Sequence, residues 1–292
     1  MFERALFERA LFERVPDNDV MKDAEVRALL QRALPRLGLR WVGFRNVSGQ
    51  VCKRIGRRIA ALGLADVSAY EARLQADAAE WRVLERLCAI TISRFHRDAP
   101  MWQRLRADVL PTLADAALAA GESKLCCWSV GCASGEEPYT LSILWALELA
   151  QRYPALRLRI LATDAGEEVL ARARSARYAA ASLSELPATW REGAFAPVAG
   201  LLQLREPFRA PVELRRADVR RDLPEDTFRL ILCRNVVCTY FDEQLQRETL
   251  QRLLSRLAPG GALVIGLQER LPADTELGAG HAEVGIYRRA SA

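Results

Sequence analysis

The sequence predicts an α/β protein in which a helical N-terminal domain precedes a domain built on a mostly parallel sheet. Two observations support this fold class. From residue 23 to about residue 118, apolar residues recur at three- and four-residue spacing, as in AEVRALLQRAL and WRVLERLCAITI, which is typical of helices. Beyond Lys124, short apolar runs alternate with amphipathic stretches, which is typical of βαβ units.

The first twenty residues are predicted to form a separate leader. MFERALFERALFERV repeats a five-residue unit, and the spacing of its phenylalanines fits neither a helix nor a strand. We assign residues 1–20 to a mobile leader, residues 21–120 to the helical domain and residues 121–292 to the α/β domain. The Ala-rich stretch 115–120, which Gly121 follows, is expected to be a connecting helix that ends just before the second domain.

Composition narrows the class of protein. With 50% hydrophobic and 27% charged residues, the chain of 292 residues is typical of a water-soluble globular protein. No window approaches the roughly 18 consecutive apolar residues of a spanning helix, and the N-terminus mixes Glu and Arg where a signal peptide is apolar. We therefore expect a cytoplasmic protein without membrane insertion. Seven scattered cysteines, with Cys126 and Cys127 as the only close pair, predict reduced thiols and no metal site.

The net charge of +5 is unevenly distributed. Residues 35–63 contain no acidic residue and seven basic ones: Arg36, Arg40, Arg45, Lys53, Arg54, Arg57 and Arg58. This pattern indicates either a docking surface for an acidic partner or an ordinary solvated helix face, and the sequence favours neither. Apart from Trp41 and Phe44, the stretch lacks interleaved aromatic residues, so a nucleic-acid partner is not expected.

The first apolar run of the α/β domain ends in a turn suited to a ligand. WSVGCASGEEPYT predicts a strand, a turn containing Gly131 and Gly135, and a helix with Pro138 at its first position. The glycine spacing is not G-x-G-x-x-G, and two glutamates would repel a phosphate. Glu136 would instead attract an amino group or a sulfonium, although a glutamate here also favours a helix N-terminus.

Polar residues also follow the next apolar runs. Asp164 comes directly after LRILAT, where a carboxylate can accept hydrogen bonds from both ribose hydroxyls, or can cap the following helix. FRLILC leads into Arg234 and Asn235, and Tyr240 follows them. Ligands of parallel sheets bind outside the carboxyl ends of the strands, so these residues should face one crevice. Together with the glycine turn, they favour a nucleoside ligand.

Four segments in this order, ITISRFHRD, WSVGCASGEEPYT, ILATDAGEEVLARARSARY and LILCRNVVCTYF, resemble the CheR family of methyltransferases, which esterify glutamates of bacterial chemoreceptors. The resemblance runs from about residue 37 to the C-terminus. It implies a class I methyltransferase (Rossmann-like) fold with a small antiparallel β insertion at about residues 199–213. It also implies S-adenosylmethionine as methyl donor, S-adenosylhomocysteine as product, and an acidic helical, chemoreceptor-like protein as substrate.

The resemblance further implies a set of site residues. Arg97 and Tyr240 would flank the transferred methyl group. Together with Gly131 of the turn, the implied cofactor-binding residues are Thr91, Ser93, Arg97, Glu136, Asp164, Asp218, Val219, Arg234 and Asn235. Within this set, Glu136 would serve the amino acid end of the cofactor, Asp164 the ribose, and Asp218 with Val219 the adenine.

The chain departs from the family pattern at three points. His96 replaces the second of two phenylalanines, the Asn-x-Thr lead-in reads Thr91-Ile92-Ser93, and the spacing from Asn235 to Tyr240 is one residue longer. An imidazole beside the methyl group could act as a general base, or it could pack where Phe packs elsewhere. The sequence therefore leaves three hypotheses: a protein-glutamate O-methyltransferase, a methyltransferase for a small molecule, and a regulatory module that binds the cofactor without transfer.

Overall fold

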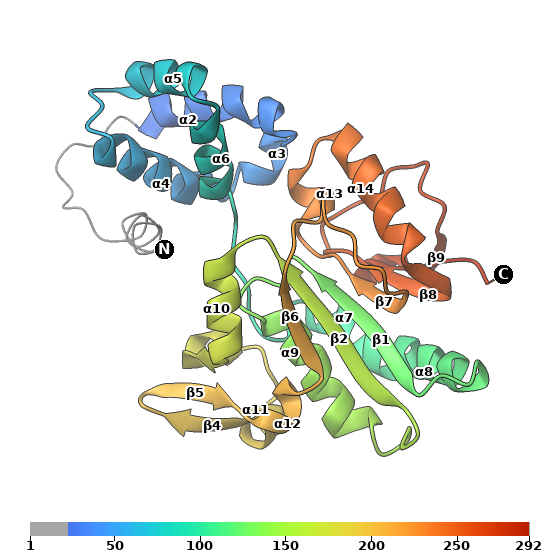
Figure 1. Ribbon diagram of the computed structural model, residues 1–292. Coiled ribbons are helices and arrows are strands. Elements are labelled where there is room, and N and C mark those ends of the chain that lie inside the picture. Colours follow the sequence, from blue (N-terminus) through green and yellow to red (C-terminus); the bar gives the residue numbers. More distant parts are fainter. Residues whose placement is uncertain (1–22, 292) are drawn as a thin grey trace. The chain divides into compact units, whose positions relative to one another are not determined.

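The computed structural model describes residues 23–291, and the chain divides into two compact units (Figure 1). The first unit ends at Ile90 and also includes Tyr240–Asp242. The second comprises Thr91–Thr239 and the residues from Glu243 onward. The leader predicted for residues 1–20 lies outside the described residues.

Helices make up the first unit, as predicted from the spacing of its apolar residues. They are α2 (Asp23–Ala33), η1 (Leu34–Leu37), α3 (Trp41–Phe44), α4 (Ser48–Ala61), α5 (Val67–Ala76) and α6 (Ala78–Leu87). Their apolar faces bury residues such as Leu30 and Ile55 completely. Inside this core Arg58 forms an ion pair with Glu80 at 2.7 Å, and the Tyr70 hydroxyl donates a hydrogen bond of 2.9 Å to the same carboxylate.

The boundary between the units lies at residues 90 and 91, not at residues 120 and 121 as predicted from the sequence. The continuous helical segment α7 (Ala99–Arg104), η2 (Leu105–Val109) and α8 (Leu110–Ala119) belongs to the second unit. Its apolar side chains, such as Trp102 and Leu113, share one buried core with Leu125 and Cys127 of the first strand. Helical periodicity identifies the helix but does not show which core its apolar face joins.

A seven-stranded sheet forms the second unit, in the order β6-β2-β1-β7-β8-β10-β9 (Figure 1). Its strands are β1 (Lys124–Val130), β2 (Arg157–Asp164), β6 (Val212–Arg216), β7 (Phe228–Leu232), β8 (Leu257–Val264), β9 (Gly278–His281) and β10 (Ile286–Arg288). The first five strands in this order are parallel, and β10 and β9 add antiparallel pairs at one edge. The order reverses between β1 and β7, and ligands of such sheets bind outside the carboxyl ends of the strands at this point.

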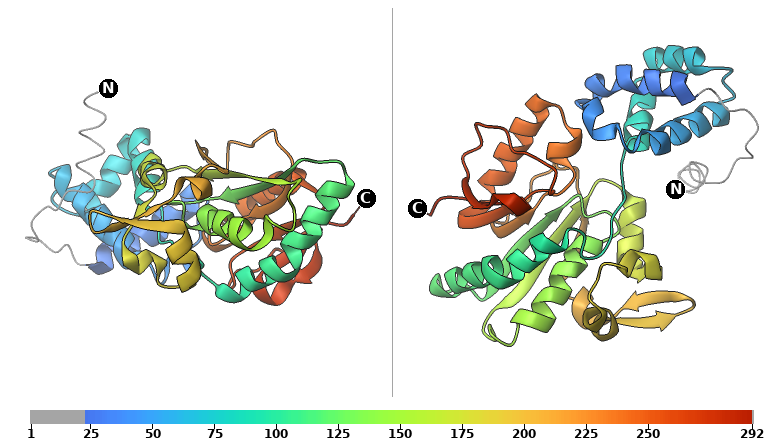
Figure 2. Two further views of the ribbon diagram at one scale, coloured as in Figure 1. Left: turned by 90° about the horizontal axis from the view of Figure 1, so that it is seen from below. Right: turned by 180° about the vertical axis from the view of Figure 1, so that it is seen from behind.

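The remaining helices of this unit connect successive strands. They are α9 (Glu136–Leu144), η3 (Trp145–Leu149), α10 (Glu167–Ser175), η4 (Ala180–Leu183), α11 (Ala188–Ala194), α12 (Glu206–Arg209), α13 (Val237–Tyr240, which ends in the first unit), α14 (Glu243–Ser255) and η5 (Ala282–Val284). The helices α8 and α9 lie on the same face of the sheet (Figure 2). Leu170 of α10 packs against Ala162 of β2 in a separate cluster. Both β1 and β2 are almost continuously buried, as expected for parallel strands covered on both faces, and this agrees with their apolar sequences.

The β insertion is present, but the predicted bounds of 199–213 were wrong. It is an antiparallel sheet of β3 (Arg177–Tyr178), β5 (Leu201–Leu204) and β4 (Phe195–Val198), in the order β3-β5-β4. The predicted range begins inside the hairpin turn at Ala199 and Gly200 and ends inside β6 of the main sheet. As an edge strand, β6 is partly exposed and reads VELRR, so it lacks the apolar run of a central parallel strand.

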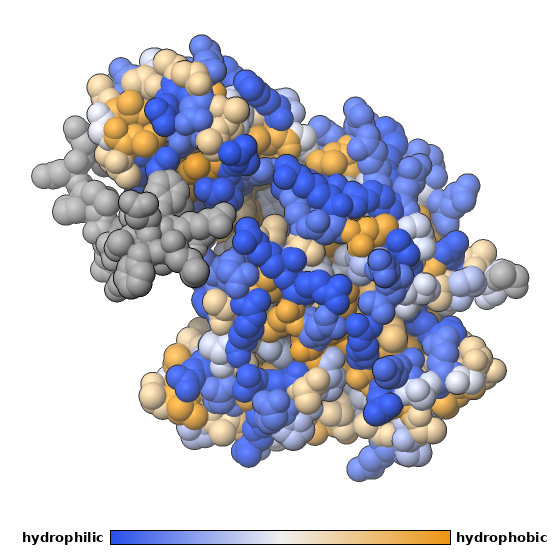
Figure 3. All heavy atoms as spheres, viewed as in Figure 1, coloured by the Kyte–Doolittle hydropathy of each residue, from blue (hydrophilic) through white to orange (hydrophobic). Residues whose placement is uncertain are grey.

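Apolar and hydrophilic side chains are mixed over the face shown in Figure 3. Apolar atoms gather at the β4–β5 hairpin, where Val198 and Leu201 are 37% and 38% exposed. Within residues 23–291, every helix is too short or too polar to pass through a lipid bilayer.

Candidate functional site

The loops that follow β1, β2 and β6 meet at Asp164, the last residue of β2. Its carboxylate Oδ2 accepts a hydrogen bond of 2.9 Å from the N–H of Ala133 in the loop after β1. Its carbonyl accepts one of 3.0 Å from the N–H of Ala217 in the loop after β6. The predicted cofactor residues on these three loops are therefore brought together at the carboxyl ends of the strands.

The turn after β1 depends on two glycines with a left-handed backbone, Gly131 (φ 68°) and Gly135 (φ 91°). A Cβ atom on Gly131 would lie 2.5 Å from the Val236 side chain, and one on Gly135 would lie 2.8 Å from the Tyr139 ring. These glycines let the turn pack against the loop after β7 and against its own helix. The helix α9 begins at Glu136 and not at Pro138, as was predicted. Pro138 is its third residue, a position where the backbone N–H has no partner within the helix.

The two adjacent glutamates of α9 have different surroundings. Glu137 accepts hydrogen bonds from the Ser129 hydroxyl at 2.7 Å and from Arg234 at 3.1 Å, so its carboxylate is satisfied by the protein. Glu136 is buried, and its Oε2 has no hydrogen-bond partner among residues 23–291. Burial raises the pKa of Glu136 above its ordinary value, an effect that the Ser93 hydroxyl partly offsets. An unpartnered buried carboxylate oxygen calls for a donor from a ligand.

Asp164 does not cap the following helix, because Gly166 is the N-cap residue of α10. Its Oδ1 accepts a hydrogen bond of 2.8 Å from the N–H of Gly166, while Oδ2 accepts the Ala133 N–H. Burial raises the pKa of Asp164, and these two hydrogen bonds oppose the rise. A carboxylate oxygen can accept more than one hydrogen bond, so both oxygens remain able to accept ribose hydroxyls.

The residues predicted for the adenine side follow β6. The Asp218 carboxylate is held by the Arg220 guanidinium through hydrogen bonds of 2.9 and 2.7 Å. Burial acts to raise the pKa of Asp218, but the hydrogen bonds and charge of Arg220 together hold it below its ordinary value. Val219 is half-buried beside it. The contact of these two residues with adenine stays a prediction.

Arg97 is a half-buried cation at the edge of this site. Its carbonyl accepts hydrogen bonds from the Trp102 indole at 3.0 Å and from Arg234 at 2.9 Å. Its own guanidinium forms no ion pair or hydrogen bond with any residue of the described chain. Thr91 and Ser93 lie on the segment without regular structure that leads to it.

His96 is enclosed by aromatic rings. Its imidazole stacks at 6.3 Å from Trp102 and meets Trp190 edge-on at 5.5 Å, and Nδ1 lies 3.0 Å from the Glu185 carbonyl. A carbonyl partner implies that Nδ1 carries the proton. Burial lowers the pKa of His96, and the contact with Glu185 partly opposes this. These contacts suit a packed aromatic residue, while the general-base role stays a prediction.

Glu269 organises the loop after β7, and the sequence interpretation missed it. Its Oε2 accepts hydrogen bonds from the N–H groups of Asn235 at 2.9 Å and Gly266 at 2.5 Å, and Oε1 accepts one of 2.6 Å from the Thr239 hydroxyl. It thereby holds Asn235, whose backbone is left-handed (φ 56°). The available signal was the position of Glu269 shortly after the apolar strand β8, the same pattern that identified Asp164.

Tyr240 belongs to the first unit. Its ring centroid lies 5.0 Å from that of Phe44, and its carbonyl accepts a hydrogen bond of 2.9 Å from the N–H of Arg40. Its proposed place beside the methyl group therefore stays a prediction.

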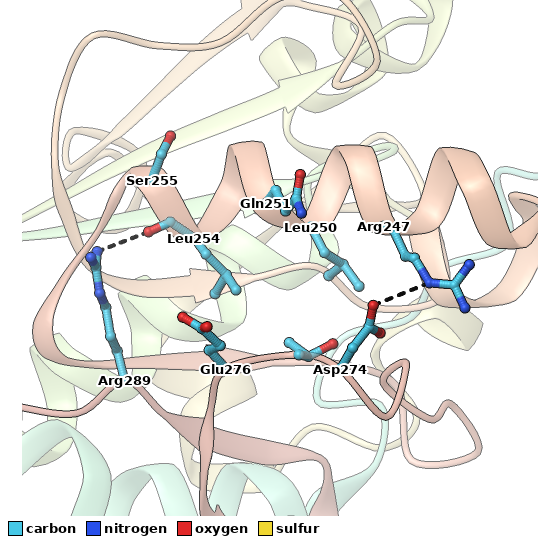
Figure 4. A pocket seen from close by; sticks show the side chains of 9 residues that line it. Arg247, Leu250, Gln251, Leu254, Ser255, Asp274, Glu276 and Arg289 are labelled. Carbon is cyan, nitrogen blue, oxygen red and sulfur yellow. Dashed lines mark hydrogen bonds and ion pairs between the residues drawn. The ribbon is translucent and has the colours of Figure 1, made fainter.

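A hollow of about 340 Å³ lies elsewhere, between α14 and the loop before β9 (Figure 4). Arg247 on α14 forms an ion pair with Asp274 of this loop at 3.3 Å, and Arg289 donates a hydrogen bond of 2.9 Å to the Leu254 carbonyl. None of the predicted site residues lines this hollow, and its two arginines are already paired with protein groups.

Comparisons with known proteins identify the family of the second unit. The family model described as "CheR methyltransferase, SAM binding domain" matches residues 91–282, which begin where the second unit begins. The chemotaxis protein methyltransferase of Listeria monocytogenes is 35% identical over 190 residues, which cover 64% of this chain and 69% of that protein. The protein of the same name from Salmonella typhimurium is 30% identical over 259 residues, which cover 85% and 84%.

Proposed function

Because this chain belongs to the CheR methyltransferase family, we propose that it transfers the methyl group of S-adenosylmethionine to glutamate side chains of an acidic helical protein, forming methyl esters. The names of its relatives support a chemoreceptor-like protein as the acceptor. The observation that carries the proposal is the half-buried residue Arg97, whose guanidinium forms no ion pair or hydrogen bond with the described residues and is available to a substrate carboxylate.

The residues present fit S-adenosylmethionine. The unpartnered Oε2 of Glu136 would accept a hydrogen bond from the amino group of the cofactor. Asp164 would accept the ribose hydroxyls, and Gly131 keeps the turn free of a side chain that would displace Val236. When bound, S-adenosylmethionine supplies an electrophilic methyl group on a sulfonium.

Methylation of a carboxylate requires little acid–base catalysis by the protein. A glutamate side chain has a reference pKa near ~4.3, so it is already ionised at neutral pH and needs no general base. The residues of this chain have to orient the carboxylate and exclude water, and orientation alone accounts for about 7–11 kcal/mol of barrier in favourable cases. Arg97 would hold one carboxylate oxygen and leave the other to react.

The basic stretch of the first unit supplies a docking surface for an acidic helix. Arg36 lies 4.1 Å over the Trp81 ring, Arg54 donates to backbone carbonyls, and Arg58 is buried against Glu80. The remaining exposed cations are Arg45, Lys53 and Arg57. Lys53 and Arg57 lie one turn apart on α4, so we assign the docking surface to this pair.

The test uses the full chain, methyl-labelled S-adenosylmethionine and lysate of the host organism. Label that stays with protein and is released by mild base supports glutamyl esters. Label on a small metabolite, or cofactor binding without transfer, would contradict the proposal and favour a small-molecule methyltransferase or a regulatory module. The double variant Lys53→Glu/Arg57→Glu should raise KM for the protein acceptor, and the matched variant Arg82→Glu/Arg86→Glu, which changes two exposed arginines one turn apart on α6, should not.

A further inference from the structure

A buried chain of polar groups connects the end of β7 to the backbone of Arg97. The Arg234 guanidinium donates to the Glu137 carboxylate at 3.1 Å, to the Asp98 carboxylate at 2.6 Å and to the Arg97 carbonyl at 2.9 Å. Glu137 is held in turn by the Ser129 hydroxyl at 2.7 Å. The Arg234 side chain is 5% exposed and that of Asp98 is 22% exposed, so these charge-assisted hydrogen bonds are partly shielded from water.

The backbone that Arg234 holds is in an unusual conformation. Both neighbours of Arg97 are left-handed, His96 with φ 58° and Asp98 with φ 65°. Non-glycine residues rarely adopt this conformation, and it persists only where the surroundings impose it. Asp98 is also the N-cap residue of α7, yet its side chain makes no capping hydrogen bond and contacts Arg234 instead. The N–H of Met101 donates to the Asp98 carbonyl at 2.9 Å, which leaves the Asp98 carboxylate for the ion pair with Arg234.

From this arrangement we propose that Arg234 is a positioning residue that acts through Arg97. Its two terminal nitrogens are committed to protein acceptors, so the guanidinium fixes the direction in which the Arg97 side chain leaves the backbone. The inference rests on the proposed function, in which Arg97 holds the substrate carboxylate. It assigns the Arg234 side chain a role different from the cofactor contact that the family resemblance implies.

The fixed geometry matters because the Arg97 guanidinium forms no ion pair or hydrogen bond within residues 23–291. An unpaired arginine side chain samples many rotamers, and ordering it on binding costs free energy. Two hydrogen bonds to its carbonyl, from Trp102 and Arg234, hold the backbone of Arg97 and fix the direction of its Cα–Cβ bond before the acceptor binds. Misplacement by about 1 Å is enough to lower turnover about 100-fold.

A double-mutant cycle tests this role. Arg234→Met should lower kcat/KM for the acceptor about 10- to 100-fold, and Arg97→Met should lower it at least as much. If Arg234 acts through Arg97, the double variant should match Arg97→Met within about twofold. Arg234→Lys should recover little, because one ammonium group cannot serve Glu137, Asp98 and the Arg97 carbonyl together. Additive losses in the double variant would overturn the proposal.

Two readouts do not depend on the identity of the acceptor. The affinity for S-adenosylhomocysteine, measured by calorimetry, should stay within about threefold in Arg234→Met, whereas a cofactor-binding side chain would lose more. Amide hydrogen exchange should accelerate in the peptide covering residues 91–104 and not in β1 or β2. If no base-labile ester is found, the proposed function fails, but the exchange measurement still decides the role of Arg234. Should Arg234→Met not fold, Asp98→Asn removes one contact and should give a smaller loss with the same dependence on Arg97.

Discussion

Two adjacent glutamates, Glu136 and Glu137, show how hydrogen-bond partners in the folded chain separate roles that the sequence cannot distinguish. Glu137 is paired with Ser129 and Arg234, whereas Glu136 keeps an oxygen without a partner in the described residues. Burying a carboxylate in this state costs free energy, and a bound amino group would recover it. The unpaired glutamate is therefore the one expected to determine affinity for the amino acid end of the cofactor.

Glu136→Gln should weaken binding of S-adenosylhomocysteine about 10- to 100-fold, because a charge-assisted hydrogen bond contributes about 1.5–3 kcal/mol. Calorimetric titration with 5′-methylthioadenosine provides the control, since this analogue keeps the adenosine and lacks the amino acid. The variant should bind the analogue as the parent protein does. Equal losses for both ligands would show that Glu136 supports the fold of the site rather than the amino group.

His96 should make stability depend on pH. Burial lowers its pKa in the folded state below the ordinary value of 6.5, so the unfolded chain takes up a proton first as pH falls. The neutral imidazole therefore contributes its full share of the free energy of unfolding above about pH 6.5. This contribution decreases as the pH falls from there through the lower pKa of the folded state. Urea unfolding at about pH 7.5 and about pH 5.5 should show this decrease, and His96→Phe should reduce it.

Replacement of the other histidine, His281→Gln, is the matched control and should leave that part of the pH dependence in place. The same His96→Phe variant also decides the general-base hypothesis. Turnover that is unchanged at every pH would show that His96 only packs between Trp102 and Trp190. A selective loss of turnover at neutral pH would instead favour a general base and an acceptor that must lose a proton.

At the scale of helices and strands, the sequence predicted those features of the fold that depend on a local pattern of residues. Glycines, glutamates and an aspartate after apolar runs predicted the ligand edge of the sheet, because parallel strands place their carboxyl ends together. Long-range pairings carried no such signal. Arg234 contacts Asp98, 136 residues away in the sequence, and Glu269 contacts Asn235, 34 residues away. The local sequence around these residues does not predict either contact. The edge strand β6 was misplaced for a related reason, since its exposed side chains remove the apolar pattern.

In the turn between β1 and α9, an alanine in place of Gly131 should cost more stability than the left-handed backbone alone explains. Gly131→Ala places a non-glycine residue in the left-handed region, which costs about 1–2 kcal/mol, and also brings its Cβ to 2.5 Å from Val236. Gly121→Ala is a matched control, because Gly121 is left-handed (φ 72°) with open space around it. Urea unfolding should show a larger loss for Gly131→Ala, with reduced affinity for S-adenosylhomocysteine only in that variant. Equal losses would mean that Val236 moves aside without consequence.

At the scale of the whole molecule, the cofactor residues and the proposed docking pair lie in different compact units. The residues that fit S-adenosylmethionine, including Glu136 and Asp164, lie in the second unit, and the exposed basic pair Lys53 and Arg57 lies in the first. The chain returns to the first unit at Tyr240–Asp242, where the N–H of Asp242 donates to the Gly38 carbonyl at 2.9 Å. The two units are therefore not simply consecutive in sequence, as the predicted boundaries had them.

This division predicts that damage to the helical core leaves the cofactor site intact. Glu80→Gln removes the charge that pairs with Arg58, whose side chain is only 10% exposed, and an uncompensated buried charge costs about 3–5 kcal/mol. The free energy of unfolding of the helical unit, measured in urea, should fall by that amount. Glu71→Gln, which breaks an exposed pair with Arg32, should cost at most about 1 kcal/mol. Under conditions where both variants are folded, their affinity for S-adenosylhomocysteine should equal that of the parent chain. A loss of affinity that parallels the loss of stability would show instead that the helical unit supports the cofactor site directly.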